Sequence, residues 1–162
     1  MPPRLLLVCA ALLFSTGGAA IKATTLNSWQ TAGFRSLAAA IALDVLLPEA
    51  RRGWSMRIVP VAAAYASCLI LFVHSTKLTT AANAIFLQST APAWLLILSP
   101  WLLKERIGRA EWLHAAALSV GMALFFLGAD VPNSTAPHPL RGNTYAAVSG
   151  LAWALTIAGL RW

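Results

Sequence analysis

The side chains best suited to hold a solute lie in one otherwise apolar segment, residues 81–103. Asn83, Thr90 and Trp94 recur with Leu87 at helical spacing, so they share one side of a predicted helix, and Gln88 lies next to them. Polar side chains in the middle of an apolar helix usually face the interior of a bundle or an aqueous cavity. This side of the helix is therefore a candidate substrate-binding surface. Ordinary hydrogen bonding between helices is the alternative interpretation.

Two further residues extend this candidate site. Pro92 has no N–H, so the carbonyl of Gln88 loses its usual helix partner and the helix can kink there, which could serve gating, binding or packing alone. Trp153, in the last apolar segment, is a candidate aromatic wall for an organic solute, with plain packing as the alternative. The predicted substrate-binding set is Asn83, Gln88, Thr90, Trp94 and Trp153.

Three ionisable residues also fall within apolar segments, where a charge is costly. Arg35 and Asp44 are nine positions apart on one predicted helix, which is about 13–14 Å along its axis, so they cannot pair directly. Each must find a partner on another helix or reach an interface. His74 lies near the end of a third helix, where a residue at the membrane interface is more common than a proton relay.

No set of residues predicts catalysis, a cofactor or a metal site. The sequence has no Ser/His dyad, no Asp-x-x-x-Asp, no His cluster and no Gly-rich Walker loop. Glu111 and His114 have the spacing of one Glu-x-x-His pair, but a single pair is too little for a metal. Glu105 is predicted to fix a helix end through a cap or salt bridge. Cys9 and Cys68 are predicted to be small buried hydrophobic residues.

The composition indicates a lipid environment. The chain has 162 residues, of which 59% are hydrophobic and 10% charged, and its mean hydropathy is +0.70. Soluble domains carry about 25% charged residues, because they need a wettable surface. The net charge of +7 does not indicate a nucleic-acid partner, since the basic residues stand in small groups between apolar segments. The predicted partner is the lipid bilayer.

The apolar segments predict an all-α, polytopic membrane helix bundle. A spanning helix needs about 20 mostly apolar residues. The six candidates are 5–21, 31–47, 58–75, 81–103, 112–128 and 144–160, of which the second is the weakest. The first also resembles a signal peptide, but the apolar helices that follow favour an uncleaved helix.

The basic residues predict the orientation of this bundle. With a cytoplasmic N-terminus, eight Lys and Arg residues fall on the cytoplasmic side and four on the other side. Such a bias is typical of cytoplasmic loops. We therefore expect a multi-pass protein of the plasma (inner) membrane with its N-terminus in the cytoplasm.

The first and last segments carry a weak internal repeat. Phe14 stands eight positions before Lys22, and Trp153 stands eight positions before Arg161. Both segments are rich in small residues. A repeat that restarts after five helices is inverted in the membrane, and inverted repeats are a recurring architecture of secondary transporters.

Motifs along nearly the whole chain resemble the EamA family of the drug/metabolite transporter superfamily. They are Phe14-Ser-Thr-Gly-Gly-Ala-Ala-Ile-Lys22, Phe34-Arg35, Thr79-Thr-Ala-Ala-Asn-Ala, Pro92, Leu103-Lys-Glu105-Arg, Gly121, Gly128, Gly142-Asn143, Trp153-Ala154 and Arg161. There are two modest departures. Phe14 stands where a Trp is common, and Lys104 replaces the usual Gly before Glu105.

The resemblance implies ten helices in two inverted five-helix repeats with a central cavity between them. Residues 1–130 would form the first repeat, 131–142 an extracytoplasmic loop, and 143–162 the first helix of a second, truncated repeat. We therefore expect an N-terminal fragment that lacks four helices of the family plan, and a homodimer is one assembly that could complete it.

The expected function is secondary transport, with export as the expected direction, of small organic metabolites or drug-like solutes by alternating access. Two alternatives stay open. A non-transporting membrane scaffold or assembly subunit would show no flux, and an intramembrane enzyme would turn over a lipid or peptide.

Overall fold

The structure is a computed structural model that describes residues 3–51, 55–102, 108–127 and 132–161. The chain forms α1 (Pro3–Ala23), α2 (Ser28–Leu46), the 3₁₀ turn η1 (Pro48–Arg51), α3 (Ile58–Leu78), α4 (Ala81–Gln88), α5 (Ala91–Leu102), α6 (Arg109–Leu127) and α7 (Pro139–Leu160). Among these residues the only β pairing is an isolated bridge between Asn133 and Ala136. The predicted all-α bundle is confirmed.

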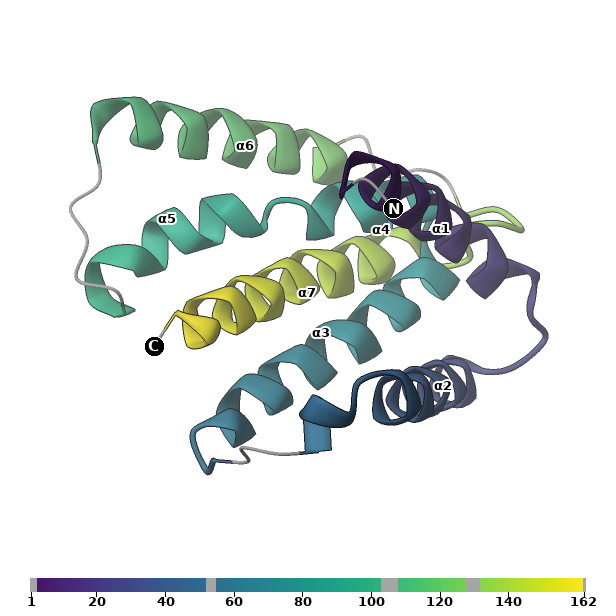
Figure 1. The fold of residues 1–162 in the computed structure, drawn as a ribbon. Coiled ribbons are helices and arrows are strands. Elements are labelled where there is room, and N and C mark those ends of the chain that lie inside the picture. The colour runs from purple at the N-terminus through teal and green to yellow at the C-terminus, as the bar shows by residue number, and fades with distance from the viewer. Residues whose placement is uncertain (1–2, 52–54, 103–107, 128–131, 162) are drawn as a thin grey trace.

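Helix α7 occupies the centre of the bundle. It packs mainly against α3 on one side and against α4 and α5 on the other. Helix α6 lies beyond α5, α2 lies beyond α3, and α1 crosses near α3 and α4 (Figure 1). The last predicted span is therefore the element around which the others are arranged.

The interior of the bundle is rich in small and polar side chains, and its exterior carries large apolar side chains. Its buried residues include Ala84, Ala146, Ala154, Ser75, Thr76, Thr79, Thr90, Asn143, Ser149 and Thr156. Phe72, Val73 and Leu87 are also buried, but many other bulky side chains are exposed, among them Leu7 and Leu12 of α1 and Val45 and Leu46 of α2. Small residues let helix backbones approach closely in lipid, and the bulky side chains outside suit a hydrocarbon solvent.

Three of the described segments are long and apolar enough to cross a membrane by length and composition. They are Arg4–Ala23, Ile58–Leu78 and Ala81–Leu102, the last of which contains both α4 and α5. Helices α2, α6 and α7 complete the predicted set of six without meeting that criterion themselves. Arg35 and Asp44 are the charges within α2, and the sequence already marks this span as the weakest.

One end of the bundle is held by contacts between segments far apart in sequence. The Lys77 ammonium, at the end of α3, donates to the Thr24 carbonyl after α1 at 2.6 Å. The backbone N–H of His138, just before α7, donates to the Leu78 carbonyl at 3.0 Å. The ends of α1 and α3 and the start of α7 therefore meet, as alternating spans require.

Two helix boundaries differ from the prediction. Helix α7 begins at Pro139 rather than Thr144, inside the expected loop, because proline suits the first helical turn, where its missing N–H is not needed. The fourth predicted span is divided: α4 ends at Gln88 and α5 begins at Ala91. The break precedes Pro92, the position where the sequence predicts a kink.

Candidate substrate cavity

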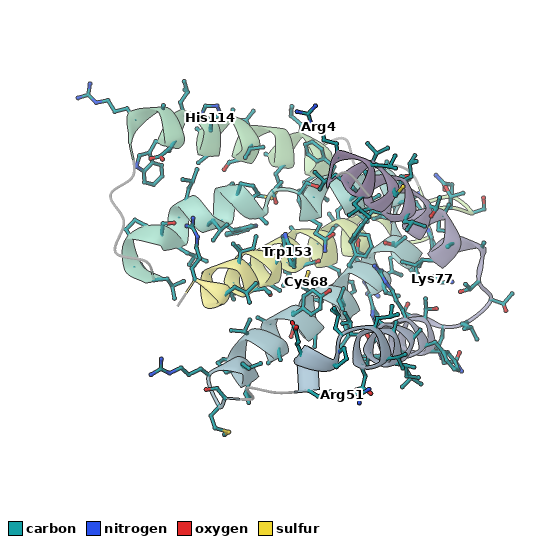
Figure 2. The ribbon with its side chains drawn as sticks, in the orientation of Figure 1. Arg4, Arg51, Cys68, Lys77, His114 and Trp153 are labelled. Atoms are coloured by element: carbon teal, nitrogen blue, oxygen red, sulfur yellow. The ribbon has the colours of Figure 1, made fainter. Side chains whose placement is uncertain are left out.

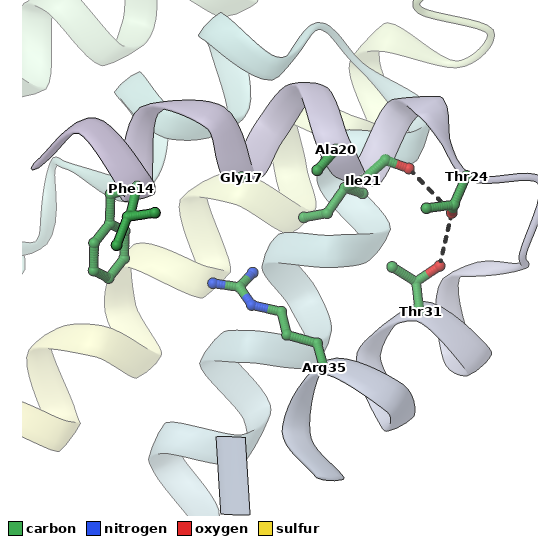
Figure 3. Close-up of a pocket in the computed structure, with 8 residues that line it drawn as sticks. Phe14, Gly17, Ala20, Ile21, Thr24, Thr31 and Arg35 are labelled. Atoms are coloured by element: carbon green, nitrogen blue, oxygen red, sulfur yellow. Dashed lines mark hydrogen bonds between the residues drawn. The ribbon is translucent and has the colours of Figure 1, made fainter. Parts of the chain in front are cut away.

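An open cavity of about 410 Å³ lies between α1 and α2. Its lining comprises Leu13, Phe14, Gly17, Ala20, Ile21, Thr24, Thr31 and Arg35. In Figure 3, Phe14 of α1 and Arg35 of α2 extend into the space between the two helices. The volume lies within the range of about 300–1,000 Å³ that is usual for small-molecule sites.

The spacing of residues on each helix explains this lining. Leu13, Phe14, Ala20 and Ile21 each lie three or four positions from Gly17, so these residues form a single stripe along α1. Thr31 and Arg35 are four positions apart and share one side of α2. Gly17 lies in the middle of the α1 stripe, and an added Cβ there would meet no atom within 4 Å. The missing side chain at Gly17 therefore leaves the cavity open.

Arg35 is the charged residue of the cavity lining. Its side chain extends from α2 towards α1, between Phe14 and Ile21 in the view of Figure 3. Its Nη1 atom is buried and has no hydrogen-bond partner in the structure. Asp44, the other ionisable residue of α2, instead pairs with Arg51 of η1, with an Nε–Oδ1 distance of 2.9 Å. The two groups are thus separated, as their spacing predicts.

The end of the cavity nearest the α1–α2 connection is polar. The Thr24 and Thr31 hydroxyl oxygens are 3.4 Å apart, and the Thr31 hydroxyl donates to the Asn27 carbonyl at 2.9 Å. The Lys77 ammonium donates to the Thr24 hydroxyl at 3.2 Å. The cavity thus combines an apolar wall, a guanidinium and a hydrogen-bonded polar end.

Gln88, from the predicted substrate-binding set, connects three helices. Its side-chain amide donates to the Cys68 sulfur at 3.2 Å and to the Ser149 hydroxyl at 3.0 Å. The Ser149 hydroxyl in turn donates to the Cys68 carbonyl at 3.1 Å. Figure 2 locates Cys68 beside the central helix. Gln88 therefore joins α4 to α3 and α7, the interhelical role that the sequence left as its alternative.

Asn83, Thr90 and Trp94 also face inward. The Thr90 hydroxyl is buried and donates to the Leu87 carbonyl at 2.6 Å. The Asn83 amide lies 3.5 Å from the Thr79 hydroxyl. The Trp94 Nε1 atom is buried, with no hydrogen-bond partner in the structure. The predicted inward side of this helix is confirmed.

Trp153, the last of the five predicted residues, is on the surface of α7 and is 37% exposed. Its ring lies 6.0 Å from that of Tyr65 on α3, and Figure 2 labels it near the middle of the helix. None of the five predicted residues lines the α1–α2 cavity. Their role in substrate binding stays a prediction.

The remaining ionisable candidates take part in local contacts. His74 lies edge-on to Trp29 at 4.8 Å and to Tyr145 at 6.3 Å. The Glu111 carboxylate accepts from the Gly108 N–H, and the His114 ring nitrogen Nδ1 lies 2.8 Å from the Ala110 carbonyl. The described ranges contain no group of three side chains able to hold a metal. Glu105 lies outside the described residues.

Sequence reasoning missed the α1–α2 cavity as a site, although it singled out parts of the lining. From the sequence, Arg35 is a costly charge and Phe14 belongs to the weak repeat. The missing information was the position of α1 relative to α2, which depends on how each helix packs against α3.

Comparison with known proteins agrees with the membrane architecture. The model of the EamA-like transporter family matches residues 2–127, which is most of the chain. No curated protein and no solved structure gives a significant match. With its apolar helices and its small, polar interior, the chain is an integral membrane protein and belongs to the EamA-like transporter family, which suggests a transporter of the drug/metabolite type.

Proposed function

We propose that this chain is a secondary transporter that exports small organic solutes by alternating access, and that the cavity between α1 and α2 holds the solute. The observation that carries the proposal is this open cavity, within a bundle of a transporter family, lined by an apolar stripe and one guanidinium. Ligand sites commonly combine an apolar wall with a few polar groups that orient the ligand.

The break between α4 and α5 supplies a candidate hinge for alternating access. Ser89 and Thr90 separate the two helices, and Pro92 removes one backbone donor just after them. Gly150 of α7 lies against this break: a Cβ added there would be 3.0 Å from the Leu87 carbonyl oxygen and 3.2 Å from that of Gln88. A change of angle at the break would therefore act directly on the central helix.

Residues at this break form a second proposed contact surface for the solute. The Gln88 amide and the Thr90 hydroxyl are bonded within the bundle, so a shift of α7 would release the amide first. Trp94 and Trp153 would then contribute aromatic surface, and Asn83 a further amide. We propose that these five residues contact the solute in another state of the transport cycle.

The proposed setting is the plasma membrane, with the N-terminus in the cytoplasm. Arg51, Arg57, Arg109 and Arg161 belong to the set that the sequence assigns to the cytoplasmic side. The bias of basic residues towards cytoplasmic segments supports this orientation. Transport as a homodimer, or together with further helices, is compatible with this proposal.

Solute counterflow in proteoliposomes tests whether the chain transports. Purified chain is reconstituted, the vesicles are preloaded with one unlabelled solute, and uptake of the same labelled solute is followed. A panel would include amino acids, aromatic carboxylates, aromatic amines and quaternary ammonium dyes. We expect saturable counterflow of at least one class without ATP. A membrane scaffold would give the same trace as protein-free vesicles for every solute, and that result would contradict the proposal.

A further inference from the structure

Arg35 lacks a counter-charge among the residues that the structure describes. The described carboxylates lie elsewhere: Asp44 pairs with Arg51, the Glu111 carboxylate accepts from a backbone N–H, and Glu49 is on the exposed turn η1. None of them lines the cavity. A cation shielded from water is costly unless an anion or several acceptors lie beside it.

Arg35 lies well inside α2, away from the nearest helix end. It follows the first residue of α2, Ser28, by about two helical turns, which is about 10 Å along the axis. Its side chain points across to α1 rather than along α2 (Figure 3). The guanidinium is therefore presented to the cavity.

The other polar groups of the cavity have no spare donor for an anion. The Thr31 hydroxyl donates to the Asn27 carbonyl at 2.9 Å, and the Thr24 hydroxyl lies 3.4 Å from the Ile21 carbonyl, to which it donates. The Lys77 ammonium donates to the Thr24 carbonyl and hydroxyl but is not part of the lining, so Arg35 is the cation that the lining itself presents to a negative group. A guanidinium is well suited to it, because its planar fork can donate two parallel hydrogen bonds to a carboxylate.

The remaining wall is apolar. Leu13 and Phe14 present hydrocarbon surface along α1, and Phe14 is 76% exposed, so its ring is available for contact. Ile21 borders the cavity but is buried in the apolar core. Gly17 and Ala20 leave room beside the ring. A ligand with one anionic group and an apolar body would match both parts of the lining.

We propose that the α1–α2 cavity selects small organic carboxylates with an apolar body, with the carboxylate held by Arg35 and the body against Leu13 and Phe14. This inference rests on the proposed function, because it names the solute class of the same cavity. It makes Arg35 the residue that discriminates an acid from its neutral or cationic analogues.

Binding of three matched probes tests the inference. Phenylacetate, phenylacetamide and phenethylamine share a phenyl body and differ in charge. Their affinities are measured by titration calorimetry with the full chain in a maltoside detergent, which contains no phosphate that could compete. We expect phenylacetate to bind at least about tenfold more tightly than either analogue, as expected for a charge-assisted hydrogen bond.

Variants assign this preference to the guanidinium. Arg35→Gln is expected to weaken phenylacetate binding by about tenfold or more. Arg35→Lys keeps the charge without the fork, so it should retain a weaker preference for phenylacetate. The Lys variant also tests the role of the guanidinium if the Gln variant does not fold. Arg57→Gln removes a cation just before α3, outside the cavity, and should leave all three affinities unchanged.

The outcomes separate the inference from the proposed function. Tight phenethylamine or phenylacetamide binding that Gly17→Phe abolishes would keep the cavity as a solute site and overturn the carboxylate preference. Phenylacetate binding that Arg35→Gln leaves unchanged would overturn the role of Arg35. Strong competition by added phosphatidylglycerol would assign the guanidinium to a lipid phosphate and contradict the proposal. Absence of both binding and counterflow for every solute would contradict the proposed function as well.

Discussion

Replacing Gly142 with alanine is expected to destabilise the bundle by about 2 kcal/mol. A Cβ on this residue of α7 would lie 2.6 Å from the Thr79 Cβ, 2.7 Å from the Thr79 nitrogen and 2.9 Å from the Leu78 carbonyl carbon. Two of these atoms belong to the backbone, so no rotation of a side chain relieves the overlap. The helices must separate, and the bonds that α7 makes with α3 weaken together.

Gly33→Ala is the matched control for this substitution. Gly33 is exposed on α2, and an added Cβ there meets nothing within 4 Å. Alanine at this position should be neutral or stabilising by up to about 1 kcal/mol, since it favours the helix. Unfolding by sodium dodecyl sulfate, followed by circular dichroism and tryptophan fluorescence, gives both free energies. Equal stability of the two variants would contradict the close packing of α7 against the end of α3.

Gly17→Phe is expected to abolish counterflow of the transported solute. The substitution places a ring in the middle of the cavity lining, where the structure leaves open space, so it fills the solute site without disturbing the packing of α1. A solute that must bind in this cavity can then no longer do so. The initial rate of counterflow in proteoliposomes measures the effect, and we expect it to fall to the level of protein-free vesicles.

Gly33→Phe controls for the added aromatic surface. It introduces the same ring into open space, on α2 but outside the cavity lining. We expect counterflow at the unsubstituted rate, with both variants showing the same thermal unfolding. Normal transport by Gly17→Phe would show that the solute passes elsewhere, and the polar side of α4 and α5 would become the leading candidate.

The helices could be predicted from the sequence because each lies largely within a mostly apolar segment of about spanning length, even where α2, α6 and α7 carry polar residues. The break near Pro92 also followed from local chemistry, since a missing N–H affects the helix wherever it is placed. The predicted start of the last helix at residue 144 is wrong, because residues 139–143 of the expected loop belong to α7, where Pro139 fits the first helical turn.

Which helices contact one another could not be predicted from the sequence. Gln88 is identifiable as an inward-facing amide, but its partners Cys68 and Ser149 are 20 and 61 positions away and belong to α3 and α7. The cavity depends in the same way on where α1 and α2 lie against α3. Arg35 could be marked as a costly charge from its position alone, whereas the open space beside Gly17 appears only in the folded bundle.

Cysteine protection tests most directly whether the solute occupies the α1–α2 cavity. Cys9 is exposed and is replaced by serine, while the buried Cys68 is kept. Gly17→Cys or Gly33→Cys is added to this background, and the rate of alkylation by N-ethylmaleimide is measured with and without the solute that gives the fastest counterflow. We predict that the solute slows alkylation at position 17 and leaves the rate at position 33 unchanged. Equal alkylation rates at position 17 with and without the solute would contradict the account.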